Sequence, residues 1–221
     1  MTNTINEYNK RVQEIEIYFN TLKFLDKGTC VIQCTDILGN YEEQEIDSEL
    51  SKILKAHGFL LLYNLIEATI RKSIDAILNS IHSTSMTYQQ LSEEFRKLWI
   101  KQENKGQTCS NEKLLSIVNS ILNAETTRFK EDCVYISGNI DAQEIRNIMK
   151  QIGGNEIRDG RNLKKIKDQR NHLAHGEFSF AEIGKDYTVQ ELIEYKESAK
   201  LYLNQVLTEI QDFIAVRKFA K

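Results

Sequence analysis

Proline is absent from all 221 residues of this sequence. Because proline is the residue that most strongly breaks helices, its absence removes the main obstacle to long ones. The sequence also lacks a run of about 18 uninterrupted apolar residues, so we expect no membrane span. The longest apolar cluster, residues 59–66, is interrupted by Asn64.

An excess of positive charge is missing as well. The 29 Lys and Arg residues are outnumbered by 32 Asp and Glu residues, which gives a formal net charge of −3. Proteins that bind nucleic acid without sequence preference draw most of their affinity from Lys and Arg contacts to phosphates. A basic coating of that kind is excluded, so any contact with nucleic acid must come from a local basic patch.

Cysteine is scarce, and the sequence has no C-x-x-C pair. The four cysteines are Cys30, Cys34, Cys109 and Cys133. Because cysteine-based zinc sites are built from closely spaced pairs, we expect no metal site, and we expect no cofactor. The N-terminal residues MTNTINEYNKR are polar and lack the apolar core of a signal peptide. We therefore expect a cytoplasmic protein with reduced thiols.

A helix-start signal recurs along the chain. In a capping box, a small polar side chain accepts a hydrogen bond from the first turn, and a Glu or Gln three residues later reaches back. Four segments match this spacing, and two serines can cap further helices: Thr4–Glu7, Thr87–Gln90, Asp141–Glu144, Thr188–Glu191, Ser48 and Ser110. Apolar residues at spacings of three and four follow each start, which indicates an all-α protein.

The apolar spacing predicts seven helices in one domain that covers residues 1–221. Their approximate bounds are 4–26, 48–82, 87–101, 111–130, 141–152, 158–175 and 188–217. Residues 28–47 are the least helical stretch, where 30–34 could form a short strand and 39–43 an exposed turn. Polar residues and glycines predict loops at 101–110 and 131–140. We expect Gly176 to end the sixth helix, because glycine tolerates the left-handed conformation common there.

Two charged residues fall on helix faces that should be buried. Successive helical residues are rotated by about 100°. This rotation places Glu67 within a stripe made of Leu60, Tyr63, Ile70, Ile74, Leu78 and Ile81. It also places Arg170 within an arc made of Leu163, Ile166, Leu173 and Ala174. Because burying an unpaired charge is costly, we predict that Glu67 and Arg170 face each other, directly or through Asn64 or Arg71. A buried salt bridge without chemistry would explain the pair as well.

Half of the four histidines lie in one short segment, Arg170-Asn-His-Leu-Ala-His175. Imidazole is the side chain best suited to moving protons near neutral pH. Arginine can hold a phosphate through two hydrogen bonds and keeps its charge. Asn171 and His175 share a helix face, with His172 beside them, whereas Arg170 lies about 140° from His175 on an ideal helix. Together these groups suit attack on a phosphodiester without a metal ion.

Basic residues precede this segment, with six basic residues against two acidic ones over positions 158–170. Such a run is typical of a solvated helix face, but beside the His/Arg segment it favours an RNA-binding patch. The candidate RNA-binding residues are Arg161, Lys164, Lys165 and Lys167. In the loop that follows, Phe178 and Phe180 could stack a base or pack under the loop.

The spacing Arg170-x-x-x-x-His175, with Asn171 directly after the arginine, resembles the R-x(4–6)-H signature of the HEPN superfamily. Three stretches resemble one bacterial HEPN family of similar length: residues 54–67, 137–141 and 170–176. The resemblance covers most of the chain. It implies an all-α bundle of about five to seven antiparallel helices. It also implies a homodimer that brings two copies of the signature into one composite active site.

The same resemblance implies a metal-independent endoribonuclease that acts as a toxin or an antiviral effector, with an antitoxin such as a nucleotidyltransferase as a possible partner. Arg170 would contact the scissile phosphate, His175 would move protons at the 2′-hydroxyl or the leaving oxygen, and Asn171 would position the phosphate or His175. Three further residues would support the site: Glu67, His172 and Asn64. The superfamily also contains inactive members, so a non-catalytic module that binds RNA, nucleotide or a protein is an alternative. An α-helical interaction protein with a structural His/Arg cluster is another.

Overall fold

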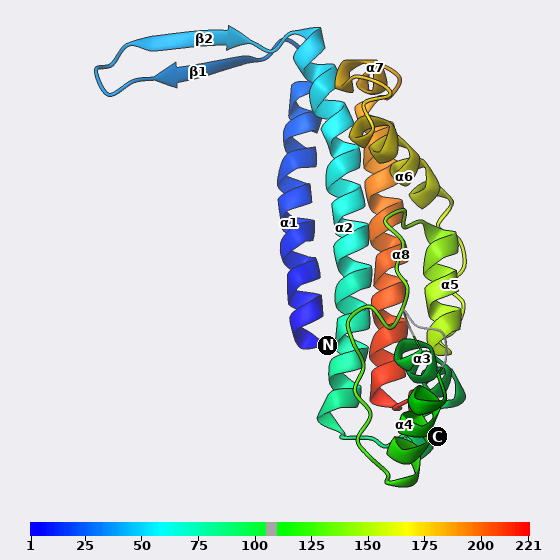
Figure 1. Ribbon diagram of the computed structural model, residues 1–221. Coiled ribbons are helices and arrows are strands. Elements are labelled where there is room, and N and C mark those ends of the chain that lie inside the picture. Colours follow the sequence, from blue (N-terminus) through cyan, green and yellow to red (C-terminus); the bar gives the residue numbers. More distant parts are fainter. Residues whose placement is uncertain (105–109) are drawn as a thin grey trace. The chain divides into compact units, whose positions relative to one another are not determined.

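The computed structural model describes residues 1–104 and 110–221 and is mostly helical (Figure 1). Its elements are α1 (Thr2–Leu25), β1 (Val31–Thr35), β2 (Tyr41–Glu45), α2 (Ser48–Ser83), the 3-10 helix η1 (Tyr88–Gln90), α3 (Glu93–Glu103), α4 (Asn111–Leu122), α5 (Ala142–Ile152), α6 (Arg161–Ala174), α7 (Phe180–Gly184) and α8 (Val189–Ala215). The all-α class is confirmed. Part of the predicted loop at 101–110, with Gly106 and Cys109, lies outside the described residues.

The described chain divides into two compact units. Unit 1 consists of Met1–Asn6, Glu67–Asp159 and Tyr202–Lys221, and unit 2 consists of Glu7–Ile66 and Gly160–Leu201. The helices α1, α2 and α8 contribute residues to both units. Unit 2 contains the whole of α6 and therefore the Arg-Asn-His-Leu-Ala-His segment.

In unit 2, α1 runs antiparallel to α2. The Arg11 guanidinium donates a hydrogen bond to the Asn64 side chain at 2.7 Å, and the Tyr18 hydroxyl donates to the Leu54 carbonyl. Later residues of α1 therefore contact earlier residues of α2, as antiparallel helices require. The two helices are joined through β1 and β2, an antiparallel hairpin in which Val31 lies opposite Glu45. All strand residues of this hairpin are exposed, and it extends away from the helices of its unit (Figure 1).

The short helix α7 packs directly on α2 in the same unit. The rings of His57 and Phe180 stack with their centroids 4.4 Å apart. Beyond α7, the Tyr187 ring meets Phe59 edge-on at 4.8 Å, and the Lys55 ammonium donates to the Tyr187 carbonyl at 2.6 Å. These contacts fix the chain that follows α6 onto α2.

A charged cluster joins α1 to α8 in unit 2. Lys196 is only 5% exposed, and its ammonium lies 2.6 Å from a Glu16 oxygen and 2.9 Å from a Glu197 oxygen. Lys200 also pairs with Glu16 at 2.5 Å. Burial alone would raise the pKa of Glu16, but the hydrogen bonds from the two lysines lower it overall. The cluster therefore provides ion-pair partners for the Lys196 ammonium, which would be costly to bury alone.

In unit 1, Phe95 of α3 lies at the centre of an aromatic core. Its ring contacts Phe129 edge-on at 5.6 Å and lies 6.3 and 6.4 Å from Phe213 and Phe219, respectively. The C-terminal residues join this core through the backbone, because the Ser92 amide donates to the Phe219 carbonyl at 2.8 Å. The core thus ties the end of α8 to α3.

Two predicted helix boundaries are wrong. The helix expected from residue 87 begins at Glu93, because Thr87 caps only the 3-10 helix η1 and Ser92 is the cap of α3. The helix expected to end at residue 130 ends at Leu122. The helix closes in a turn at Ala124, whose φ is +50° and whose amide donates to the Ile121 carbonyl at 3.2 Å. Beyond this turn, Thr127 places both its amide and its hydroxyl 2.8 Å from the Met86 carbonyl, which holds the chain in a non-helical conformation.

The non-helical prediction for 28–47 is confirmed in outline. The strand expected at 30–34 corresponds to β1. The turn expected at 39–43 lies earlier, at 36–40, because the Asp36 carboxylate accepts hydrogen bonds from the Leu38 and Asn40 amides. Residues 41–43 belong to β2 instead.

Among the described residues, α2 is the one helix long and apolar enough to cross a membrane by length and composition. Half of its most apolar window is buried inside the protein, as in a core helix.

Candidate functional site

The helix α6 presents the signature and ends at a defined point. Leu163, Ile166 and Leu173 bury one face of the helix. At its end, the Gly176 amide donates to the Leu173 carbonyl at 3.3 Å and the Glu177 amide donates to the His172 carbonyl at 3.0 Å. This pair of bonds is the Schellman motif, which requires a left-handed residue. Gly176 provides it with φ of +67°, so the predicted helix end is confirmed.

Arg170 lies against α2. It is partly buried, which is less than its predicted place among Leu163, Ile166 and Leu173 required. Its guanidinium carbon is 3.6 Å from the centroid of the buried Tyr63 ring. Such cation–π stacking holds the planar guanidinium in a fixed orientation while it keeps its charge and its hydrogen-bond donors.

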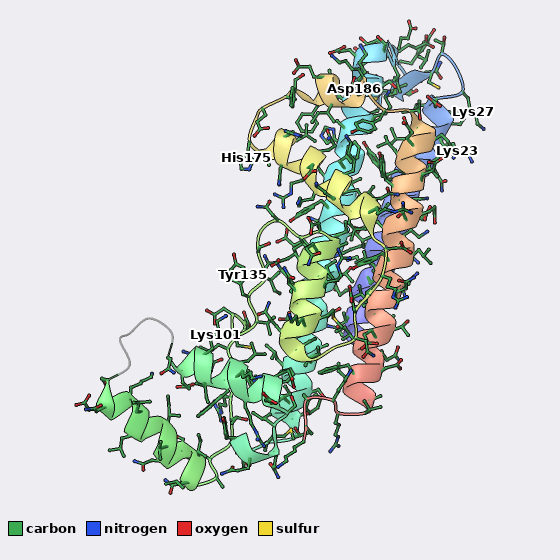
Figure 2. The ribbon with its side chains drawn as sticks, turned by 90° about the vertical axis from the view of Figure 1, so that its right-hand side faces the viewer. Lys23, Lys27, Lys101, Tyr135, His175 and Asp186 are labelled. Atoms are coloured by element: carbon green, nitrogen blue, oxygen red, sulfur yellow. The ribbon has the colours of Figure 1, made fainter. Side chains whose placement is uncertain are left out.

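His175 is the C-cap residue of α6 and is exposed. Its backbone amide donates to the Asn171 carbonyl at 2.9 Å, which keeps the residue close to helical geometry. Figure 2 shows it at the C-terminal end of α6, at the surface. Within the described part of the chain, its imidazole makes no hydrogen bond. His175 is therefore open to a ligand.

His172 has a different environment. Its Nδ1 atom lies 2.5 Å from a carboxylate oxygen of Glu177. The Phe178 ring meets the imidazole edge-on, with centroids 5.2 Å apart. The turn at Gly176 brings Glu177 back over the end of α6. The sequence interpretation did not include Glu177, although the predicted left-handed turn was the signal that could have identified it.

The signature residues lie on two faces of α6. By the rotation of about 100° per residue, His172 and His175 are about 60° apart, whereas Arg170 is about 160° and 140° from them. The buried contact of Arg170 with Tyr63 and the exposure of His175 agree with this division. One copy of α6 thus presents its imidazoles and its guanidinium in different directions.

Phe180 packs rather than faces solvent. It stacks on His57, so the packing interpretation holds for this residue. Phe178 is 49% exposed and lies beside His172. The helix α7 was missed, yet its capping box is present in the sequence: the Ser179 hydroxyl accepts from the Glu182 amide at 3.2 Å, and the Ser179 amide donates to the Glu182 carboxylate at 2.7 Å.

The four candidate RNA-binding residues do not share one environment. Arg161 and Lys164 are exposed at the start of α6. Lys165 lies over the Tyr187 ring at 5.5 Å, and a hydrogen bond with the Tyr187 hydroxyl raises the pKa of its ammonium. Lys167 is partly buried and lies 3.6 Å from an Asp168 oxygen. Contact of these residues with RNA stays a prediction.

Glu67 is less buried than the helix-face prediction required. Its side chain is 31% exposed, and it pairs with Arg71 at 2.9 Å within α2. The predicted stripe omitted Phe59, Ile66 and Ile77, which are all buried. By the 100° rotation these three lie about 80° to 100° from Glu67, so the buried face is centred beside the glutamate. Glu67 therefore lies on the flank of that face.

Asn64 is also on a flank of α2. It is exposed, and its side-chain oxygen accepts the hydrogen bond from Arg11 of α1. Asn64 therefore helps to hold α1 against α2. The supporting roles of Asn64 and Glu67 and the pairing of Glu67 with Arg170 stay predictions.

An open hollow of about 1070 Å³ lies in unit 1. Lys72, His82 and Phe129 are among its lining residues, whereas no signature residue lines it. The described residues form no group of three or more His, Cys, Asp or Glu side chains that could hold a metal ion. The candidate site is therefore the surface at the end of α6.

The family model described as HEPN_MAE_28990-like HEPN matches residues 1–219. The match covers nearly the whole chain and agrees with the superfamily that the signature resembles. No curated protein and no solved structure matches the chain.

Proposed function

The chain belongs to the HEPN_MAE_28990-like HEPN family, and we propose that it is a metal-independent endoribonuclease that cleaves RNA by attack of the 2′-hydroxyl. HEPN domains generally act as RNases or as nucleotide-binding modules. The observation that carries the catalytic proposal is the environment of His175. It is an exposed imidazole without a hydrogen bond to the described chain, presented at the end of a helix by a fixed turn.

Each signature residue has a role in this proposal. Arg170 contacts the scissile phosphate and stabilises the negative charge of the transition state. Its stacking on Tyr63 limits the motion of the guanidinium, so that little ordering is needed when the phosphate binds. His175 transfers a proton at the reacting oxygens, and Asn171, one helical turn earlier on the same face, positions the phosphate or the imidazole.

We further propose a homodimer with a composite site. Because Arg170 and the imidazoles of one α6 point in different directions, a phosphate held by the guanidinium of one copy can meet the imidazoles of the second. In the cell, the protein would act in the cytoplasm as a toxin or antiviral effector. An antitoxin protein, of the nucleotidyltransferase type or another, would then restrain it.

The test is RNA cleavage in excess chelator by the wild-type protein, Arg170→Ala and His175→Ala. We expect both substitutions to lower kcat by about 10²–10⁴-fold while the thermal midpoint and the dimer persist. An oligonucleotide with a single 2′-deoxy sugar at the cleavage position must resist cleavage, and the products of ordinary RNA must end in a cyclic phosphate. Binding of RNA without cleavage by the wild type would instead identify a non-catalytic module.

A further inference from the structure

The His172–Glu177 pair is a defined contact with little value for stability. The two side chains are 36% and 54% exposed, and their atoms lie 2.5 Å apart. Exposed ion pairs contribute at most about 1 kcal/mol. The backbone nevertheless fixes both partners, because the Glu177 amide donates to the carbonyl of His172 itself. The turn therefore places a carboxylate on an imidazole at the surface, one helical turn from His175.

The contact determines which imidazole nitrogen can react. A carboxylate at Nδ1 keeps a proton on that nitrogen and leaves the lone pair on Nε2. The Phe178 ring packs against the imidazole in an edge-on arrangement, with centroids 5.2 Å apart. A carboxylate that orients an imidazole in this way stabilises the cation formed when Nε2 accepts a proton, as in hydrolytic triads. His172 is thus arranged as a base.

His175 is arranged differently. No carboxylate of the described chain holds its ring, and as the C-cap residue it keeps a helical backbone with φ of −90° and ψ of −3°. It therefore stays in the i, i+3 relation to His172, at which Cβ atoms are about 5–6 Å apart. Two imidazoles at that spacing can reach two oxygens of one phosphodiester.

We propose that His172, oriented by Glu177, is the general base and His175 the general acid of the cleavage. This inference rests on the proposed function and assigns both proton transfers to one copy of the chain. Nε2 of His172 takes the proton of the 2′-hydroxyl as that oxygen bonds to phosphorus. The bond from phosphorus to the 5′ oxygen breaks, and the imidazolium of His175 gives that oxygen its proton. The products are a 2′,3′-cyclic phosphate and a 5′-hydroxyl.

A sulfur substrate separates the two roles. In an RNA whose scissile 5′ oxygen is replaced by sulfur, the leaving thiolate needs no proton. We expect His175→Ala to lose about 10²–10⁴-fold on ordinary RNA and to recover most of the wild-type rate on the sulfur substrate. His172→Ala should lose a similar factor on both substrates. If His172→Ala matches the wild type, or if the sulfur substrate restores it as fully as His175→Ala, the assignment is wrong.

Glu177 is tested as a positioning residue. Glu177→Gln should lower kcat about tenfold on both substrates and leave KM unchanged, and Glu177→Asp should recover part of kcat because it restores the charge. Asp186→Asn, which removes another exposed carboxylate of unit 2, is the matched control and should keep the wild-type rate. Equal rates for Glu177→Gln and the wild type would overturn the role of the carboxylate.

Mixed dimers test whether one copy supplies both imidazoles. A dimer of one His172→Ala chain and one His175→Ala chain then has a defect in each imidazole pair and should stay inactive. Recovery of cleavage in that dimer would show that the base and the acid come from different copies. Thermal unfolding of each variant shows whether the fold is retained. A wild-type protein that cleaves neither substrate overturns the proposed function, whereas an active wild type confines any failure to this assignment.

Discussion

Substitution of Gly184 is the most direct test of how α7, the helix that follows the signature, packs on α2. This glycine is the last residue of α7, and an added Cβ atom would lie 1.8 Å from the Lys52 carbonyl oxygen and 2.6 Å from its carbonyl carbon. Both distances are far below the roughly 3.5–4.0 Å at which non-bonded heavy atoms pack best. Because the obstacle is the backbone of α2 rather than a flexible side chain, Gly184→Ala must displace α7.

The size of the effect follows from what α7 buries. Overpacking in a close-packed interior costs about 1–3 kcal/mol, and displacement of α7 would also weaken the stack of His57 on Phe180, worth about 0.5–1.5 kcal/mol. We therefore expect Gly184→Ala to lower the free energy of unfolding by about 3 kcal/mol. For a chain of this length that corresponds to a fall in Tm of roughly 6–12 °C.

Urea and thermal unfolding of Gly184→Ala measure this loss, with Gly28→Ala as the matched control. Gly28 has no atom within 4 Å of an added Cβ and no left-handed backbone, so its substitution should change stability by less than about 0.5 kcal/mol. Equal midpoints for the two variants would refute the direct contact of α7 with α2.

Three further outcomes can be measured. Gly176→Ala should cost about 1–2 kcal/mol although space is open, because its φ of +67° strains any other residue, and a cost equal to that of an exposed helix substitution would contradict the Schellman turn. Glu16→Gln should cost about 1–3 kcal/mol by removing a partner of buried Lys196. The pKa of the Glu16 carboxyl is lowered from 4.5, so its contribution to the free energy of unfolding is present above about pH 4.5 and is lost as the pH falls through the lowered pKa. The difference in stability between the wild type and Glu16→Gln should therefore shrink in acid. Burial raises the pKa of the Cys133 thiol to about 11, so iodoacetamide at about pH 8 should modify exposed Cys34 in the native protein and reach Cys133 only after unfolding, as mass spectrometry can show.

The helices could be predicted where local capping chemistry sets their ends. Asp141 accepts hydrogen bonds from the Gln143 and Glu144 amides at 3.0 Å, and the helix it predicts, α5, has the expected bounds. The end of α4 was missed, because the helix closes in a left-handed turn at Ala124, with φ of +50°, where the sequence has no glycine to signal it. The chain beyond the turn is then held by the Thr127 hydroxyl on the Met86 carbonyl, 41 residues away in sequence. Capping signals are local, whereas such a contact depends on tertiary structure.

In the candidate site, too, features set by local sequence could be predicted, whereas features set by tertiary structure could not. The turn at Gly176 follows from glycine conformation, and the structure has it. Arg170 is partly buried, so helical periodicity gave the face of α6 on which it lies but overstated its burial. The burial of Glu67 was overestimated, because one apolar stripe was chosen on a helix that is buried over a wider arc. The partner of His172 was missed because Glu177 lies beyond the helix end, where periodicity no longer tells which side chains meet.

Arg170 and His175 are five positions apart on α6, and this spacing leads to a final prediction about the dimer. On one α6 the guanidinium packs on Tyr63 while the imidazoles lie about 140–160° away, so we expect a phosphate to be held by Arg170 of one copy and attacked beside His175 of the other. A purified dimer of one Arg170→Ala chain and one His175→Ala chain then keeps one intact site of two and should recover up to about half of the wild-type activity. If both groups act within the same chain, each site of that dimer carries one defect and the activity stays at the level of the single variants.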